Sequence, residues 1–110
     1  MKLLKAEFSG SDLALHRLLS VDMLTPGHLE FGTAVMPRGC RQPPQGVSCH
    51  DGDEISLLLR GRAIVETASG RVEMKSGDIV LIKAGEAHAT EALEDCHVYY
   101  VLTKSGVAGG

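Results

Sequence analysis

The chain has 110 residues, a formal net charge of −3 and 44% hydrophobic residues, with few aromatic side chains and no tryptophan. This length makes one domain, 1–110, with a core of aliphatic side chains. The small net charge excludes a strong attraction to nucleic acid or an anionic membrane, and no window approaches the ~18 apolar residues of a membrane span. We therefore predict neither nucleic acid nor membrane as a partner.

The cysteines and the N-terminus indicate the compartment. Three cysteines are an odd number and show no C-x-x-C spacing. The N-terminal residues lack the apolar stretch of a signal peptide. Together these features predict a cytoplasmic protein, in a reducing compartment.

Residues 13–19 allow two interpretations. Their four leucines fit a helical stripe, whereas the alternation at the start of the segment fits a strand. We favour the strand because the rest of the chain is β. Residues 29–36 form the next predicted strand, and the proline-containing segments 37–39 and 43–46 break the chain after it.

From residue 46 onward, short strands alternate with turns that contain glycine. The predicted strands are 54–60, 63–67, 71–75, 79–82, one that begins at His88, and 98–102. Short strands separated by turn signals every 8–12 residues or so predict an all-β sandwich or barrel. Residues 105–110 are small and predict a flexible C-terminal tail.

Three side chains in this β region form a candidate ligand set. His50 precedes Glu54 by four residues, and His88 follows on a distant strand. Two imidazoles and one carboxylate suit a mononuclear transition metal with open coordination positions. His50, Glu54 and His88 are therefore the predicted ligands of one divalent transition metal, with Fe, Zn, Mn, Ni and Cu not distinguished.

The segments that carry these residues resemble the paired motifs of the cupin family, G-x5-H-x-H-x(3,4)-E-x6-G and G-x5-P-x-G-x2-H-x3-N. The first motif falls on residues 42–61, where His50 to Gly61 match its second half, and residues 77–92 match the second motif in spacing. The matching residues are His50, Glu54, Gly61, Gly77, Gly85 and His88. The resemblance implies an all-β cupin jelly-roll barrel (double-stranded β-helix) of two antiparallel sheets. It also implies a homodimer, because small single-domain cupins often are homodimers.

Four positions depart from the family pattern. Gln42, Ser48, Lys83 and Ala92 stand where the motifs have glycine, histidine, proline and asparagine. Ser48 matters most for chemistry, because cupins commonly use three histidines and one glutamate. The remaining two-His, one-Glu set implies a metal with water or substrate in the vacated place. His97 would replace the missing histidine if its side chain faces the interior.

A mouth of such a barrel is a frequent place for a small-molecule pocket. The predicted lining residues are Ser48, Phe31, Met36, Ser56, Leu58, Tyr99 and Val101, with Val65 and Ile82 beside them. Ser56 and Leu58 follow from strand parity with Glu54. Phe31 and Met36 are out of phase on one strand, so both fit only if that strand bulges. The set predicts a mostly apolar pocket.

Three functions stay open. The first is a metal-dependent enzyme acting on a small organic molecule by oxygenase, isomerase, cyclase or lyase chemistry, among which the fold does not decide. The ligand set leans toward non-haem Fe(II) with O₂. The second is a non-catalytic cupin that binds or senses a small ligand, which Ser48 favours. The third is a degenerate cupin with a structural role, ranked last because all three ligands stand at the family spacing.

Overall fold

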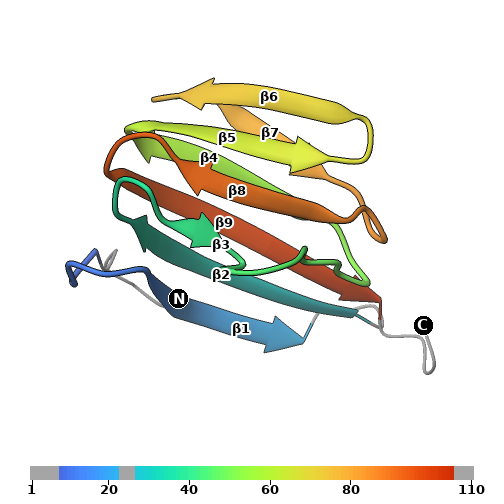
Figure 1. The fold of residues 1–110 in the computed structure, drawn as a ribbon. Coiled ribbons are helices and arrows are strands. Elements are labelled where there is room, and N and C mark those ends of the chain that lie inside the picture. Colours follow the sequence, from blue (N-terminus) through green and yellow to red (C-terminus); the bar gives the residue numbers. More distant parts are fainter. Residues whose placement is uncertain (1–7, 23–26, 106–110) are drawn as a thin grey trace.

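The computed structural model describes residues 8–22 and 27–105, and within them the regular structure consists of strands. They are β1 (Ala14–Asp22), β2 (Gly27–Met36), β3 (Arg41–Gln42), β4 (Glu54–Arg60), β5 (Arg62–Thr67), β6 (Gly70–Lys75), β7 (Ile79–Ile82), β8 (His88–Ala92) and β9 (Cys96–Ser105). Sheet A has the order β1-β2-β9-β4-β7 and sheet B the order β3-β8-β5-β6. The two antiparallel sheets pack face to face (Figure 1), so the predicted all-β jelly-roll barrel is confirmed.

Residues 14–22 form a strand, so the helical alternative for residues 13–19 is wrong. Residues 14–22 pair along β2 because their apolar alternation suits a sheet with one covered face. β2 and β9 are longer than the predicted 29–36 and 98–102, since they pair continuously from Gly27↔Ser105 to Met36↔Cys96. The predicted tail 105–110 lies outside the described residues, except Ser105 at the end of β9.

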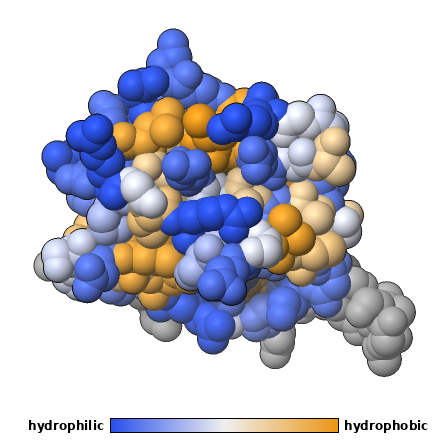
Figure 2. All heavy atoms as spheres, in the orientation of Figure 1, coloured by the Kyte–Doolittle hydropathy of each residue, from blue (hydrophilic) through white to orange (hydrophobic). Residues whose placement is uncertain are grey.

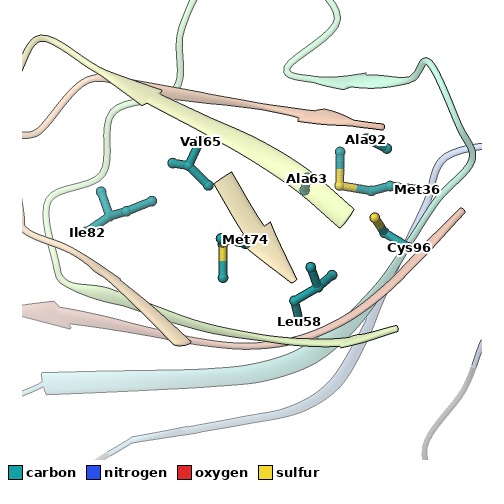
Figure 3. Packing of buried hydrophobic residues seen from close by; sticks show 8 residues of the cluster. All are labelled: Met36, Leu58, Ala63, Val65, Met74, Ile82, Ala92 and Cys96. Atoms are coloured by element: carbon teal, nitrogen blue, oxygen red, sulfur yellow. The ribbon is translucent and has the colours of Figure 1, made fainter. Parts of the chain in front are cut away.

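The interior between the sheets is apolar at one end. Met36, Leu58, Ala63, Ala92 and Cys96, here called the core end, are each at most 4% exposed. Val65, Met74 and Ile82 continue the cluster toward the middle of the barrel (Figure 3). The opposite end, where β4 and β8 begin, is polar; we call it the polar end and define it by His50, Glu54 and His88.

The outer faces of the sheets differ in polarity. On sheet A, two cross-strand rows over β7, β4, β9 and β2 are almost entirely apolar: Leu81–Ile55–Val101–Phe31 and Ile79–Leu57–Tyr99–Thr33. On sheet B, outward side chains form the ion pairs Arg62–Glu73 and Arg71–Glu66. Figure 2 shows the sheet B side of the molecule, with hydrophilic residues across its middle. The described part of the chain contains no helix with the length and apolar character that crossing a membrane requires.

Candidate metal centre

Backbone hydrogen bonds join the two segments that carry the histidines. Ser48 N–H donates to the His88 carbonyl at 2.8 Å, and His88 N–H donates back to the Ser48 carbonyl at 2.9 Å. Gly85 N–H donates to the His50 carbonyl at 2.8 Å. The loop before β4 and the start of β8 therefore lie side by side, which brings residues distant in sequence to one place.

The three predicted ligands converge at the polar end. His50 Nε2 lies 3.5 Å from Glu54 Oε1, and the rings of His50 and His88 have centroids 5.1 Å apart. One donor atom from each of the three residues lies within 4.8 Å of the other two. Among residues 8–22 and 27–105, no other group of three His, Cys, Asp or Glu side chains converges in this way.

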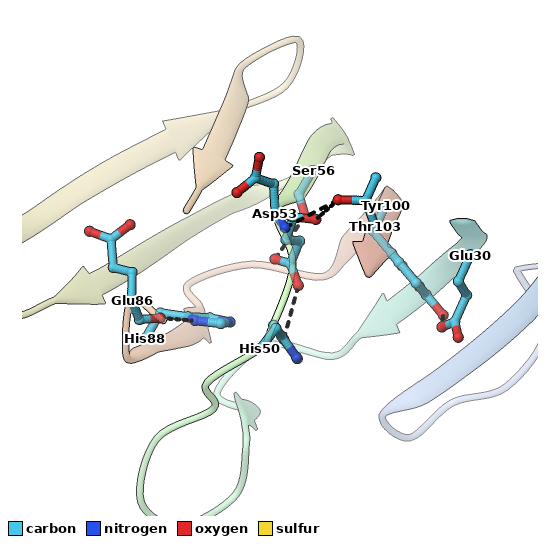
Figure 4. A network of polar contacts seen from close by, with 9 residues as sticks. Glu30, His50, Asp53, Ser56, Glu86, His88, Tyr100 and Thr103 are labelled. Carbon is cyan, nitrogen blue, oxygen red and sulfur yellow. Dashed lines mark hydrogen bonds and ion pairs between the residues drawn. The ribbon is translucent and has the colours of Figure 1, made fainter. Parts of the chain in front are cut away.

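Two hydrogen bonds orient the candidate ligands (Figure 4). The ring nitrogen Nδ1 of His88 lies 3.0 Å from the Glu86 carbonyl oxygen, so a proton on Nδ1 leaves Nε2 as the electron-pair donor. The Ser56 hydroxyl donates to Glu54 Oε2 at 3.2 Å, and the other carboxylate oxygen faces His50. Such outer partners fix the direction in which a ligand presents its donor atom.

Gly52 allows the loop between His50 and Glu54 to dock on β9. A Cβ atom at this buried glycine would lie 1.3 Å from the Thr103 carbonyl oxygen, so only glycine fits. Asp53 secures the docked loop: its N–H donates to Thr103 Oγ1 at 3.2 Å, and its carbonyl accepts from Thr103 N–H at 3.0 Å. Sequence reasoning missed Gly52, because the approaching strand is distant in the chain.

A cavity of about 100 Å³ lies inside the barrel next to Glu54. Most of its wall is aliphatic, and its polar contributions come from Gln42, Glu54, Ser56, Thr90 and Tyr100. Of the predicted lining residues, Met36, Ser56, Leu58, Val65 and Ile82 do line it. Ser48 lies opposite His88 in an isolated β-bridge instead.

Three of the predicted lining residues are on the wrong face. Phe31, Tyr99 and Val101 belong to the outer rows of sheet A, where the ring centroids of Phe31 and Tyr99 are 5.9 Å apart. The bulge that would have allowed Phe31 and Met36 to share a face is absent from the β2–β9 pairing. Met36 therefore points inward and Phe31 outward.

Tyr100, the neighbour of Tyr99, is the tyrosine that faces the cavity. Its hydroxyl donates to Glu30 Oε2 at 3.2 Å, and Glu30 Oε1 lies 3.0 Å from Arg17 Nε. The ring has room because Gly32 is opposite: a Cβ there would lie 2.5 Å from the Tyr100 hydroxyl. Burial, followed by the nearby Glu30 carboxylate, raises the pKa of Tyr100 to about 12, so the phenol is a hydrogen-bond donor.

His97 does not replace the missing histidine. It lies on the outer face of sheet A, where its ring stacks on Phe8 with centroids 4.5 Å apart. Its neighbours in the chain, Cys96 and Val98, face the interior, so alternation along β9 turns His97 outward. The prediction that it might complete the ligand set is therefore wrong.

The donor set fits a transition metal. Imidazole nitrogen and carboxylate oxygen ligands at about 2.0–2.2 Å from one ion lie up to about 4 Å from each other. The three donor atoms, which lie within 4.8 Å of one another, already approach this spacing. Two neutral imidazoles with one carboxylate leave coordination positions for other ligands.

Comparisons with known proteins agree with this architecture. The family model of the cupin domain matches residues 33–103, and a search of curated proteins finds no match. A cupin superfamily protein from Desulfitobacterium hafniense has a TM-score of 0.75 at 14% identity, covering 90% of this chain and 84% of that chain. An RmlC-like cupin from Methanocaldococcus jannaschii has a TM-score of 0.72 at 12% identity, covering 96% and 90%.

A mutant salicylate 1,2-dioxygenase from Pseudoaminobacter salicylatoxidans is also similar, with a TM-score of 0.61 at 11% identity. The similarity covers 67% of this chain and 20% of the dioxygenase. These identities show a shared fold. Because the family match spans more than half of the sequence, the chain belongs to the cupin family.

Proposed function

We propose that this cupin binds one divalent transition metal through His50, Glu54 and His88, and that it is an enzyme acting on a small organic molecule. The observation that carries the proposal is the convergence of these three donors within 4.8 Å at the polar end. The ion would supply Lewis acidity, an acidified water or a binding place for O₂. A salicylate 1,2-dioxygenase is similar in fold, which makes oxygenase chemistry a candidate beside isomerase, cyclase and lyase chemistry.

The side chains around the ligands have separate tasks in this proposal. Ser56 holds one oxygen of Glu54 and so keeps the other oxygen directed at His50. The aliphatic wall of the cavity excludes water from a substrate, and its small volume limits the substrate to a compact molecule. The Tyr100 phenol stays protonated below its raised pKa of about 12, and its hydrogen bond to Glu30 holds the ring against the cavity.

The experiment is elemental analysis of the protein purified without chelators, beside a His50→Ala, His88→Ala double variant. We expect near-stoichiometric metal in the unchanged protein and its loss in the variant, since two of three ligands are removed. A His16→Ala, His28→Ala variant is the matched control, because it removes two histidines from strands β1 and β2 of sheet A. Metal should persist in that control.

Two outcomes would contradict parts of the proposal. Absence of metal in all three proteins, even after incubation with Fe(II), Mn, Ni and Zn, would refute the metal site. Substrate-dependent oxygen uptake that persists in the double variant would refute a catalytic role of the site.

The alternative function is a metal-bearing or metal-free cupin that binds a ligand without converting it. The specific observation in its favour is Ser48, which stands beside His88 where the family motif has a histidine. A small molecule that raises the melting temperature and is recovered chemically unchanged would favour this alternative over an enzyme.

The predicted homodimer has support in the outer face of sheet A. Ile55, Leu59, Ile79 and Leu81 are 46%, 45%, 67% and 50% exposed there. Exposed apolar side chains that gather on one face are characteristic of protein contact surfaces. Sedimentation velocity would test this proposal, which a single monomeric species at high concentration would refute.

A further inference from the structure

The turn that precedes β8 has a defined type. Glu86 N–H donates to the Lys83 carbonyl at 3.0 Å, and Gly85 has a φ of +79°. Among the residues that the structure describes, only glycines have a positive φ, so the φ of Ala84 is negative. Residues 83–86, here called the histidine turn, therefore form a type II turn with Ala84 and Gly85 at its two central positions.

The histidine turn sets the direction of the His88 ring. The carbonyl oxygen of Glu86, its last residue, lies 3.0 Å from His88 Nδ1 (Figure 4). This partner fixes both the tautomer and the direction of Nε2, the nitrogen that is available to a metal. The position of Nε2 therefore depends on what holds the turn in place.

Two contacts from the segment before β4 hold the histidine turn. Gly85 N–H donates to the His50 carbonyl at 2.8 Å, and Ala84 N–H donates to Asp53 Oδ1 at 3.0 Å. The second bond is charge-assisted and therefore stronger than a bond between neutral groups. Asp53 is fixed in its turn, because its N–H and its carbonyl are both bonded to Thr103 of β9. The Asp53 side chain thus links the histidine turn to β9.

A second turn in the chain offers a comparison. In residues 75–78, Asp78 N–H donates to the Lys75 carbonyl at 2.9 Å and Gly77 has a φ of +95°, so the turn type is the same. The Asp78 carboxylate accepts from Lys75 N–H at 2.8 Å. Gly77 N–H donates to the carbonyl of Leu58 at the core end. This second turn is therefore held like the histidine turn, but it carries none of the candidate ligands.

We propose that Asp53 is a positioning residue of the candidate metal centre. Its carboxylate holds Ala84 N–H, and the turn fixed in this way holds the His88 imidazole. Asp53 belongs neither to the ligand set nor to the specified positions of the family motif. The inference rests on the proposed function as far as the ion is concerned, whereas the orientation of His88 can be measured without an ion.

The experiment removes the hydrogen bond from each side in the full chain. Asp53→Ala removes the acceptor. Ala84→Pro removes the N–H donor, and proline suits the first central position of a type II turn. Each variant should bind Co(II), whose visible absorption reports its coordination, about 10–100-fold more weakly, as when other outer partners of metal ligands are removed. The double variant should lose little more than either single variant, because both act on one bond.

Two further variants separate this bond from other effects. Asp53→Asn keeps an oxygen acceptor and removes the charge, so it should recover most of the cobalt affinity. Asp78→Ala is the matched control, since it removes a carboxylate that bonds a backbone N–H in the second turn. This control should lower the thermal unfolding temperature and leave the cobalt affinity unchanged.

A measurement on the metal-free protein tests the ring itself. Imidazole ¹⁵N chemical shifts at about pH 8, where a free histidine side chain is neutral, report which ring nitrogen carries the proton. We expect His88 to be protonated on Nδ1 in the unchanged protein and in Asp53→Asn. In Asp53→Ala and Ala84→Pro we expect a mixture of both tautomers, because the Glu86 carbonyl is no longer held in place.

The outcomes separate the inference from the proposed function. If the unchanged protein binds cobalt and neither Asp53→Ala nor Ala84→Pro weakens it, the inference is overturned and the metal site stands. Equal losses in Asp53→Asn and Asp53→Ala would also overturn it, since the charge and not the bond would then be responsible. If the unchanged protein binds no cobalt, the proposed function fails, and the tautomer of His88 still decides whether Asp53 positions the ring. Should Asp53→Ala not fold, Ala84→Pro decides alone.

Discussion

The core end and the polar end of the barrel interior are built differently, although the same strands form both. Along β4, Leu58 at the core end is 1% exposed, whereas Glu54 at the polar end is half-buried. The core end is closed by side-chain packing. The polar end is closed by backbone hydrogen bonds between loops and by the docking of Gly52 on β9.

This difference assigns separate tasks to the two ends. Close packing makes the core end the main source of stability, because buried apolar area and dispersion contacts accumulate there. The polar end holds side chains that would bind an ion, so its shape depends on how the loops are held. Substitutions at the core end should therefore lower stability and leave metal binding unchanged, whereas substitutions at the polar end should change metal binding.

The largest effect is expected for Gly52→Ala, because it makes the loop of the polar end incompatible with β9. The added Cβ would overlap the Thr103 carbonyl oxygen at 1.3 Å, which forces the backbone to move. We expect a loss of unfolding free energy above about 4 kcal/mol, in the exceptional range for a point substitution, together with loss of cobalt binding. Urea unfolding measures the change in unfolding free energy, and cobalt titration measures the loss of cobalt binding.

Gly46→Ala is the control for this substitution. Gly46 has a positive φ, +73°, which Gly52 does not have, and a Cβ at Gly46 would meet no atom within 4 Å. Only the backbone conformation is then penalised, by about 1–2 kcal/mol. Equal losses in the two variants would show that the contact with Thr103 does not matter.

Leu58→Ala tests the core end with a smaller expected effect. Removing this buried side chain should lower the unfolding free energy by about 2–5 kcal/mol, as for other core leucines. Cobalt stoichiometry of the folded protein should stay unchanged, because Leu58 lies four residues from Glu54 along β4, which is about 13 Å. Leu59→Ala, at a site 45% exposed, should cost less than about 1 kcal/mol. Loss of cobalt binding in Leu58→Ala would contradict the separation of the two ends.

The smallest expected effect is a pH dependence of stability. It comes from Tyr100, which faces the cavity inside the barrel. Its pKa rises from 10.0 to about 12 on folding, so the folded state binds the phenolic proton more tightly. The resulting stabilisation is fully present below pH 10 and is lost as pH rises toward 12. Tyr100→Phe should remove this slope from denaturation midpoints measured across that range. Tyr99→Phe, a substitution on the outer face, should retain the slope. A slope that persists in Tyr100→Phe would refute Tyr100 as its source.

Much of the fold was predictable because strand signals are local. The alternation and glycine turns located the strand 79–82 at its observed bounds and the start of β8 at His88. The spacing of His50, Glu54 and His88 identified the residues that the structure brings together. Both the strand positions and the candidate ligands could be predicted because each depends on residue types and their spacing along the chain.

Other features were decided only by tertiary structure. The sequence shows that Tyr99 and Tyr100 face opposite sides, but the pairing of β9 with β2 and β4 decides that Tyr100 faces the cavity and places Phe31 and Val101 outside. The need for glycine at position 52 arises from a carbonyl contributed by β9. The sequence by itself therefore determined which elements form and which residues carry the candidate chemistry, because these depend on local pattern. Tertiary structure decided the face and the neighbour of each side chain, because these depend on contacts between segments distant in the chain.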